Sequence, residues 1–112
     1  MRNIIYTEEF SDFFSTLNNR TQTKVLYALN ILSTMRVVST KLVKKLVGTD
    51  FYELRVSVDN EYRLIMYSVD KENIIEAKCA IVLCGFMKKS NRDYEVEVKR
   101  AKQILKRYEI ED

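Results

Sequence analysis

The fold of this protein is decided by the stretch Phe51-Tyr-Glu-Leu-Arg-Val-Ser-Val58, in which apolar and polar residues alternate. Successive side chains of a β-strand point to opposite faces of a sheet, so a period of two predicts a strand that is buried on one face. The apolar face carries Tyr52, Leu54, Val56 and Val58. The polar face carries Glu53, Arg55 and Ser57.

Two further strands are predicted after this one. Residues Asp59-Asn60 supply a turn, and Tyr62 to Val69 returns as a second strand. After a turn at 70–73, a long third strand runs from Ile74 to Cys84, and we expect it to stop at Gly85. Three consecutive strands joined by short turns predict an antiparallel meander.

The amino-terminal part of the chain predicts a short strand and two helices. Asn3 to Tyr6 is the strand, and Thr7 is placed to cap the first helix. A second helix is expected from about Thr21 to Met35. Two amphipathic helices joined by a short loop predict an antiparallel hairpin. The inward face of the first helix consists of Phe10, Phe13, Phe14 and Leu17.

Two other segments flank the meander. Lys41 to Val47 is short, basic and followed by Gly48, which fits one helical turn or an irregular loop. The last element is a helix that begins at Ser90 or Asn91, with acidic residues near its first turn. The packing stripe of this helix consists of Tyr94, Val98, Ala101, Leu105 and Tyr108.

These elements predict a single α+β domain over residues 1–112. Their order is β-α-α-β-β-β-α, an antiparallel sheet with an amino-terminal helical hairpin and a carboxy-terminal helix, and we expect the helices to cover one face of the sheet. A chain of 112 residues supports one hydrophobic core, and no proline, repeat or low-complexity segment divides it.

The residue inventory restricts the chemistry that is available. The chain has no histidine, which argues against a Ser-His-Asp hydrolase and other histidine mechanisms. Cys79 and Cys84 are five apart in one predicted strand, so we expect their side chains on opposite faces, a poor arrangement for a metal site. We therefore expect no metal and no cofactor, and chemistry based on Lys, Arg, Tyr, Glu or Asp.

Charge and hydropathy indicate the environment and the partner. No apolar run approaches the length of a membrane span, and the amino terminus lacks a signal-peptide core, so a cytoplasmic location is expected. The net charge is +3, but residues 35–50 carry four basic residues and one acidic, and residues 85–107 carry eight basic and three acidic. Two basic segments favour a polyanionic partner, and the alternative is an ordinary solvated surface.

The predicted meander brings basic residues toward one cleft. Arg55 and Arg63 lie on adjacent strands, and Lys88 and Lys89 follow the third strand. Adjacent strands are about 4.8 Å apart, so the four side chains can converge. Guanidinium groups bind phosphate through a bidentate fork, and lysines add point charge.

Four motifs carry a resemblance to a known family. They are Val47-Gly-Thr-Asp-Phe-Tyr-Glu-Leu-Arg55, Glu61-Tyr-Arg-Leu-Ile-Met-Tyr67, Ile81-Val-Leu-Cys-Gly-Phe-Met-Lys-Lys89, and a final helix that contains Ala101. In order and spacing over residues 40–108 they resemble the RelE/HigB superfamily of toxins, and in particular its phage-derived, HigB-like Gp49-type branch. The amino-terminal hairpin agrees with this family in architecture.

The resemblance implies a fold and an activity. Members of this superfamily are the toxic half of type II toxin–antitoxin pairs and cleave mRNA on the ribosome. They typically act without metal: the ribose 2′-hydroxyl attacks the neighbouring phosphate and leaves a cyclic phosphate. The implied partners are a cognate antitoxin, often of helix-turn-helix type, the ribosome and its mRNA, with no membrane.

The resemblance also implies roles for residues of this chain. Arg55 and Arg63 correspond to ligands of the phosphate and transition state. Lys88, or alternatively Lys89, corresponds to the cation that in relatives can protonate the leaving 5′-oxygen. Tyr94 lies where some relatives place a tyrosine that stacks on the substrate base. Glu53 stands where RelE itself has a lysine and HigB-like members have glutamate, and it is a candidate general base. The expected substrate-binding residues are Lys89, Arg92, Lys44 and Lys45.

Structural and functional alternatives remain open. Glu53 and Arg55 could form an ion pair with no catalytic role, and Tyr94 shares a helix stripe with Val98, which favours core packing equally. Lys88, Lys89 and Arg92 could instead bind an acidic antitoxin segment. For the whole protein, the alternatives are a ParE-like toxin that poisons DNA gyrase and a non-toxic fold relative that acts as a binding module.

Overall fold

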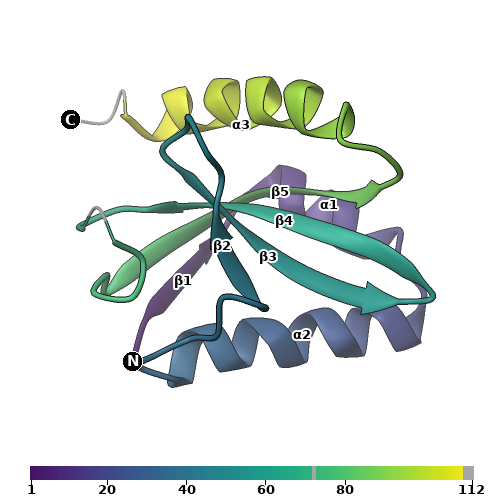
Figure 1. Cartoon of the computed structure of the whole chain (residues 1–112), viewed down its shortest axis with the longest axis horizontal. Helices are drawn as coiled ribbons and strands as arrows, with labels where there is room; N and C mark the ends of the chain where they lie inside the picture. The colour runs from purple at the N-terminus through teal and green to yellow at the C-terminus, as the bar shows by residue number, and fades with distance from the viewer. Residues whose placement is uncertain (72, 110–112) are drawn as a thin grey trace.

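A computed structural model describes residues 1–71 and 73–109, the last of these by its backbone only. Over this part of the chain the protein forms a five-stranded sheet in the order β1-β5-β4-β3-β2 (Figure 1). Strand β1 pairs with β5 in parallel, and the other three pairings are antiparallel. The strands are β1 (Asn3–Tyr6), β2 (Val43–Lys45), β3 (Phe51–Val58), β4 (Asn60–Ser68) and β5 (Cys79–Lys88).

Helices cover both faces of the sheet, and the expectation of helices on one face is wrong. The hairpin of α1 (Glu8–Ser15) and α2 (Asn19–Thr34) lies on one side, and α3 (Asp93–Glu109) lies on the other (Figure 1). Two separate apolar cores result, one between the hairpin and the sheet and one beneath α3, so the expectation of one hydrophobic core is also wrong. The apolar stripe of α3 shows which face of the helix is buried, but it does not indicate on which face of the sheet the helix packs.

Side-chain caps begin the two helices of the hairpin. The Thr7 hydroxyl accepts a hydrogen bond from the backbone N–H of Phe10 at 3.0 Å and donates one to the carbonyl of Leu83 at 2.6 Å. The Asn18 side chain accepts from the N–H of Thr21 at 2.8 Å. The predicted hairpin is therefore confirmed, with α2 beginning two residues earlier than expected.

The third strand of the meander lies further along the chain than the sequence indicated. Strand β5 begins at Cys79, runs through Gly85 and ends at Lys88, so the expected strand from Ile74 and its stop at the glycine are wrong. The carbonyls of Ile74 and Ile75 accept hydrogen bonds from the buried Arg2 guanidinium instead of pairing in a sheet.

Gly85 is required by packing inside the sheet. A Cβ atom at this position would lie 2.5 Å from Cδ2 of Phe13 and 2.9 Å from Cδ2 of Leu64. The glycine therefore lets the Phe13 ring of α1 approach the backbone of β5 closely.

The segment Lys41 to Val47 contains a strand and no helical turn. Strand β2 pairs with β3, and Lys44 lies opposite Glu53. A strand of three residues is too short to show a period, and its hydrogen bonds to the edge of β3 form it.

A bulge in β5 decides which residues face α3. Ile65 pairs with Cys84 while the next residue, Met66, pairs with Val82, so the strand carries one extra residue here. After the bulge, Cys84, Phe86 and Lys88 face the same side as Ile81. By the same alternation Cys79 and Cys84 share a face, and the expectation of opposite faces is wrong. The bulge thus directs Lys88 toward the polar residues of β3 and β4.

None of the helices in the described part of the chain combines the length and the apolar character that crossing a membrane requires.

Candidate active site

The candidate site lies on the α3 face of the sheet, where polar side chains of three strands meet. Arg55 of β3 lies directly opposite Arg63 of β4. Glu61 of β4 lies between Ser57 of β3 and Lys88 of β5. The alternation that was predicted for β3 is confirmed, because its apolar residues belong to the core beneath the helical hairpin.

Glu53 lies between the two arginines. Its side chain is 2% exposed, and its Oε1 accepts a hydrogen bond from Arg55 Nε at 2.6 Å and lies 3.8 Å from Arg63 Nε. Its Oε2 is buried without a hydrogen-bond partner among the described residues. Like charges directly opposite each other on adjacent strands repel, so the carboxylate offsets the repulsion between Arg55 and Arg63.

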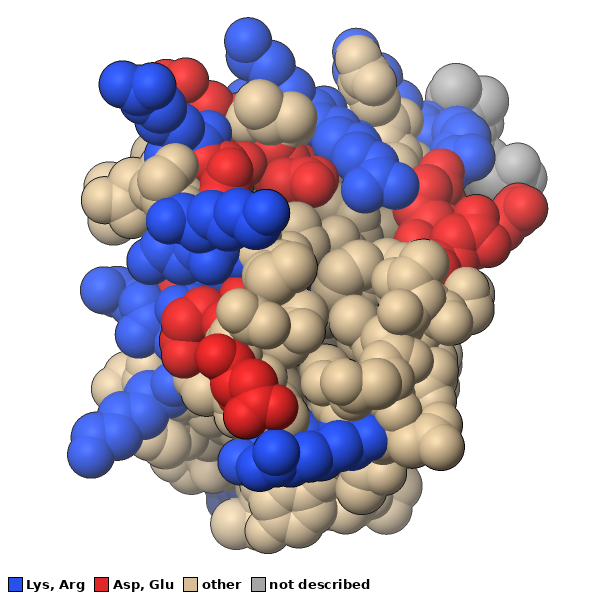
Figure 2. Space-filling view, turned by 90° about the vertical axis from the view of Figure 1, so that its right-hand side faces the viewer, with Lys and Arg blue, Asp and Glu red and all other residues tan. Residues whose placement is uncertain are grey.

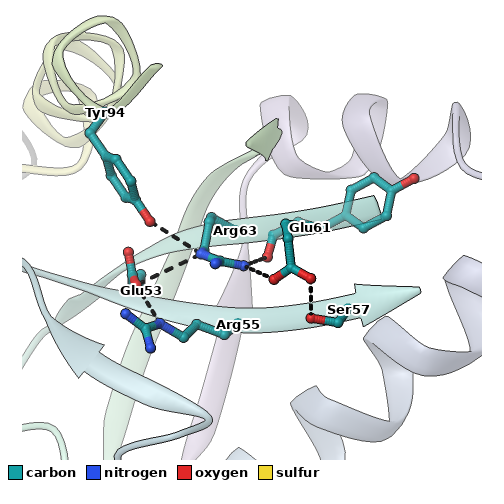
Figure 3. A network of polar contacts seen from close by, with 7 residues as sticks. Glu53, Arg55, Ser57, Glu61, Arg63 and Tyr94 are labelled. Carbon is teal, nitrogen blue, oxygen red and sulfur yellow. Dashed lines mark hydrogen bonds and ion pairs between the residues drawn. The ribbon is translucent and has the colours of Figure 1, made fainter. Parts of the chain in front are cut away.

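Arg63 is buried, and its Nε and Nη1 donate hydrogen bonds to neighbouring residues (Figure 3). Its Nε donates to the Tyr94 hydroxyl at 3.1 Å, and its Nη1 donates to the Tyr62 carbonyl at 2.9 Å and to Glu61 Oε1 at 3.2 Å. Burial acts to lower the pKa of Arg63, but the hydrogen bonds to Tyr94 and Glu61 outweigh it, and the pKa is raised. Arg63 is therefore a permanent cation that holds two strands and a helix together.

Tyr94 of α3 combines packing with a polar contact. Its ring meets the edge of Phe86 at 5.5 Å between centroids, and the Lys88 ammonium lies 5.5 Å from its centroid. Burial, followed by the nearby Glu53 carboxylate, raises the pKa of Tyr94. Its hydroxyl and part of its ring make internal contacts, so Tyr94 takes part in packing, while its stacking on a substrate base stays a prediction.

A cleft of about 320 Å³ opens beside these residues. It brings together six of the nine residues that the sequence placed in the site, and Arg63 lies outside its lining. The six are Lys44, Lys45, Glu53, Arg55, Lys88 and Tyr94.

Arg55 and Lys88 are the cations of β3 and β5 that line the cleft. The Arg55 side chain is 35% exposed, and only its Nε is bound to Glu53. The remaining guanidinium nitrogens and the Lys88 ammonium can act on an anion in the cleft. Fixed cations at such a position favour negative charge that develops on a phosphate during its transfer.

Lys44 and Lys45 reach the cleft from the edge strand β2. Both are exposed, and the Lys45 ammonium lies 5.5 Å from the centroid of the Tyr52 ring. The strand pairing that the sequence did not predict thus positions two of the expected substrate-binding lysines.

Lys89 and Arg92 lie in the loop between β5 and α3 and do not line the cleft. Both are exposed. The loop is held by its backbone, because the N–H groups of Lys89 and Ser90 donate to the Asp93 carboxylate at 2.7 and 2.9 Å. These hydrogen bonds lower the pKa of Asp93.

Sequence reasoning placed Ser57 on the polar face of its strand but assigned neither Ser57 nor Glu61 to the site. The Ser57 hydroxyl donates to Glu61 Oε2 at 2.6 Å, and this bond is the largest of the effects that lower the pKa of Glu61. Continuing the alternation of two adjacent strands onto the polar face would have found both residues. Other lining residues come from loops and α3, where no local signal marks them: Leu46, Val47, Thr49, Asn91 and Val98.

The side chains suit anion binding more than metal binding. Among the described residues, no group of three or more His, Cys, Asp or Glu side chains is placed to hold a metal ion. On the face seen in Figure 2, Lys and Arg side chains crowd the left edge and the upper part, where α3 lies, with acidic side chains among them. Much of the area below and to the right is uncharged.

Comparison with solved structures identifies the fold. A mutant of the E. coli toxin RelE in the free state is similar with a TM-score of 0.60 and 19% identity, over 88% of this chain and 96% of that chain. The isolated E. coli RelE toxin is similar with a TM-score of 0.59 and 20% identity, over 89% and 98% of the two chains. Among curated proteins, none matches this sequence.

Comparison with protein families identifies the group of sequences. The family described as phage-derived protein Gp49-like (DUF891) matches residues 12–106, which is most of the chain. The resemblance and the fold class expected from the sequence motifs are thereby confirmed. This protein therefore belongs to the phage-derived Gp49-like family, and it has the fold of the RelE toxin.

Proposed function

We propose that this protein is the toxin of a type II toxin–antitoxin pair and that it cleaves mRNA on the ribosome without a metal ion. The observation that carries the proposal is the cleft in which Arg55, Lys88 and Tyr94 meet, on a fold shared with a toxin. Family membership supports the same function.

The reaction is an internal transfer of the phosphoryl group. The 2′-oxygen of the ribose forms a bond to the adjacent phosphorus, and the bond from phosphorus to the 5′-oxygen of the next nucleotide breaks. The products are a 2′,3′-cyclic phosphate and a 5′-hydroxyl. One proton leaves the 2′-hydroxyl, and one reaches the 5′-oxygen.

Arg55 and Lys88 have the direct roles in this proposal. Arg55 stabilises the charge on the phosphorane through the guanidinium nitrogens that Glu53 leaves free. Lys88 donates the proton to the departing 5′-oxygen. Lys44 and Lys45, at the other side of the cleft, and Lys89 and Arg92, in the loop before α3, bind flanking phosphates.

Three residues have supporting roles in addition to the roles that the family resemblance implies. They are Arg63, Glu53 and Tyr94. Arg63 is buried, so it acts on the phosphate at longer range and holds Glu53 and Tyr94 in place. Tyr94 offers the remaining surface of its ring to a base in the cleft. Glu53 orients Arg55, and it accepts the 2′-hydroxyl proton only if the substrate reaches its buried Oε2.

The partners follow from the same proposal. The protein acts where ribosomes translate, in the cytoplasm, and a helix-turn-helix antitoxin neutralises it. A neighbouring reading frame for a small helix-turn-helix protein would support this part of the proposal.

Induced expression tests the function. The expected result is arrested translation, with primer extension revealing new 5′ ends inside ribosome-bound messages. Co-expression of the antitoxin should restore growth. A folded protein that causes no arrest and produces no cuts would contradict the proposal.

One observation favours a second candidate, a binding module without nuclease activity. Glu53 neutralises part of the charge of Arg55 and Arg63 and occupies groups that would otherwise contact a phosphate. Under this reading the folded protein is harmless, although it still binds its partner. Growth arrest with DNA damage and intact message would instead indicate a ParE-like poison of gyrase.

A further inference from the structure

A second pocket adjoins the candidate cleft and has no role in the proposed reaction. Its volume is about 420 Å³, and it lies between α3 and the turn that joins β2 to β3. Thr49 lines both this pocket and the cleft, so the two are neighbours across the turn. The second pocket is lined by Gly48, Thr49, Asp50, Phe51, Lys102, Leu105 and Lys106.

The turn between the two pockets is a fixed ridge. The Thr49 hydroxyl donates to the Leu46 carbonyl at 2.8 Å and accepts from the N–H of Phe51 at 3.0 Å. The N–H of Leu46 donates to the carbonyl of Phe51 across the turn at 3.0 Å, and Gly48 adopts a positive φ of 77° at its tip. The relative position of the two pockets is therefore set by the fold.

The charges of α3 divide into two groups. Arg100 pairs with Glu97 at 3.7 Å, and Arg107 pairs with Glu9 of α1. Lys102 and Lys106 form no ion pair with any carboxylate among the described side chains. The arginines of this helix are thus neutralised within the protein, whereas the lysines of the pocket, like Lys99, pair with none of the carboxylates that the structure describes.

Helix stability does not explain the lysine pair. Like charges four residues apart on a helix destabilise it by a few tenths of a kcal/mol. The helix dipole favours a cation at Lys106, in the last turn, but its effect does not extend to Lys102. Two lysines that line one pocket and pair with none of the described carboxylates are suited to bind an anion.

We propose that this second pocket binds a flanking phosphate of single-stranded RNA. The strand whose scissile phosphate lies at Arg55 and Lys88 crosses the ridge of residues 46–50 and places another phosphate between Lys102 and Lys106. This inference rests on the proposed function, because that function supplies the strand. Asp50 at the rim weakens the binding of the anion.

Binding of uncleavable RNA tests the inference apart from catalysis. The probes are 2′-O-methyl RNA oligonucleotides of three and ten nucleotides, with affinity measured by fluorescence anisotropy at several salt concentrations. The ten-mer can span both pockets, whereas the three-mer fills the cleft alone. The wild-type protein should bind the ten-mer more tightly than the three-mer.

The decisive variant is Lys102→Gln with Lys106→Gln. It should lower affinity for the ten-mer by on the order of tenfold and reduce the salt slope by about 0.7 for each phosphate that the variant no longer neutralises, with little change for the three-mer. Asp50→Asn should have the opposite effect on the ten-mer. The control is Lys24→Gln with Lys78→Gln, which removes the same charge from exposed positions that line neither pocket.

The outcomes separate this inference from the proposed function. The inference is overturned if the pocket variant and the control lose the same affinity for the ten-mer. It is also overturned if the wild-type protein binds neither oligonucleotide, or binds the three-mer and the ten-mer with equal affinity. Cleavage of ribosome-bound message is measured separately with the same variants. Absence of cleavage by the wild type contradicts the proposed function. The binding measurements then test by themselves whether the second pocket binds RNA.

Discussion

Arg63 of β4 donates a hydrogen bond from Nε to the hydroxyl of Tyr94 on α3 at 3.1 Å, across 31 residues of sequence. This bond attaches the carboxy-terminal helix to the polar face of the sheet. It also places the ring of Tyr94 at the wall of the cleft. The geometry of the candidate site therefore depends on the packing of α3.

Tyr94→Phe should separate the two contributions of this tyrosine. The contact with Phe86 remains, because the ring is retained, while Arg63 loses one acceptor. We expect a folded protein that is destabilised by about 1 kcal/mol in urea unfolding, with reduced cleavage. Tyr94→Ala should cost more, because it also removes the packing. Equal stability of Tyr94→Phe and the wild type would show that the bond contributes little.

Arg63→Ala should destabilise the protein as well as abolish cleavage. It removes a cation next to the buried Glu53 and one donor each from the Tyr94 hydroxyl and from Oε1 of Glu61. Removing one partner of a buried ion pair costs about 3 kcal/mol or more. Urea unfolding measures the loss of stability, and antitoxin binding at low temperature shows whether the partner surface survives. Unchanged cleavage in this variant would remove Arg63 from the site.

Arg55→Ala should reduce cleavage and also destabilise the protein, because it removes the nearer cation of the buried Glu53 carboxylate, at 2.6 Å, and leaves only Arg63 at 3.8 Å. The Arg55 side chain is partly exposed and lines the cleft, so it is placed to act on substrate. Loss of one such charge-stabilising group typically lowers kcat by about 10²- to 10³-fold. Primer extension in a translation extract measures the rate. The control is Arg20→Ala, whose exposed side chain pairs with Asp59 away from the cleft.

Gly85→Ala should destabilise the sheet, although the residue precedes the basic segment by only a few positions. The new methyl group would overlap the Phe13 ring at 2.5 Å. Overpacking of this kind costs about 1–3 kcal/mol. Combining Gly85→Ala with Phe13→Ala should recover part of the stability, since the overlap is removed. A double variant with strictly additive losses of stability would contradict the overlap.

Stability should fall at alkaline pH in part through Cys84. Burial, with a contribution from Glu97, raises the pKa of this thiol from 9.0 to about 12. Between these values the unfolded chain has released the proton and the folded protein keeps it, so the free energy of unfolding falls as pH rises. The slope approaches about 1.4 kcal/mol per pH unit for one group.

Cys84→Ala provides the measurement for this effect. In reducing buffer, the slope of unfolding free energy against pH above pH 9 should be shallower than in the wild type. Part of the slope should remain, because the pKa values of Tyr6, Tyr94 and Cys79 are also raised. An unchanged slope would contradict the raised pKa of the buried Cys84 thiol.

Most of the elements were predictable because their signals are local. The alternation of β3 put Glu53 and Arg55 on one face, and the cap at Thr7 marked the start of α1. Helix α3 begins at Asp93 and not at the expected Ser90 or Asn91. Strand β2 was not predictable, since three residues gain their extended form from pairing with β3. The expected stop at Gly85 failed because a glycine inside a strand can serve close packing as well as a turn.

The sequence predicted most of the charged residues that line the cleft, but it did not predict how they are arranged in space. Arg55, Lys88 and the lysines of β2 do line one cleft. Lys89 and Arg92, equally basic and adjacent in sequence, do not, because they lie in the loop beyond the end of β5. The bulge in β5, which has no clear sequence signature, decides that Lys88 shares a face with Arg55.

The sequence by itself determined the meander, the helices and the collection of cations, because periodicity and charge are properties of neighbouring residues. Only the tertiary structure decided that Arg63 is buried, that Glu53 lies between two arginines and that Tyr94 joins them from the opposite layer. The physical reason is that burial and ion pairing arise between segments far apart in the chain. The docking of α3 and the register of three strands fix those distances.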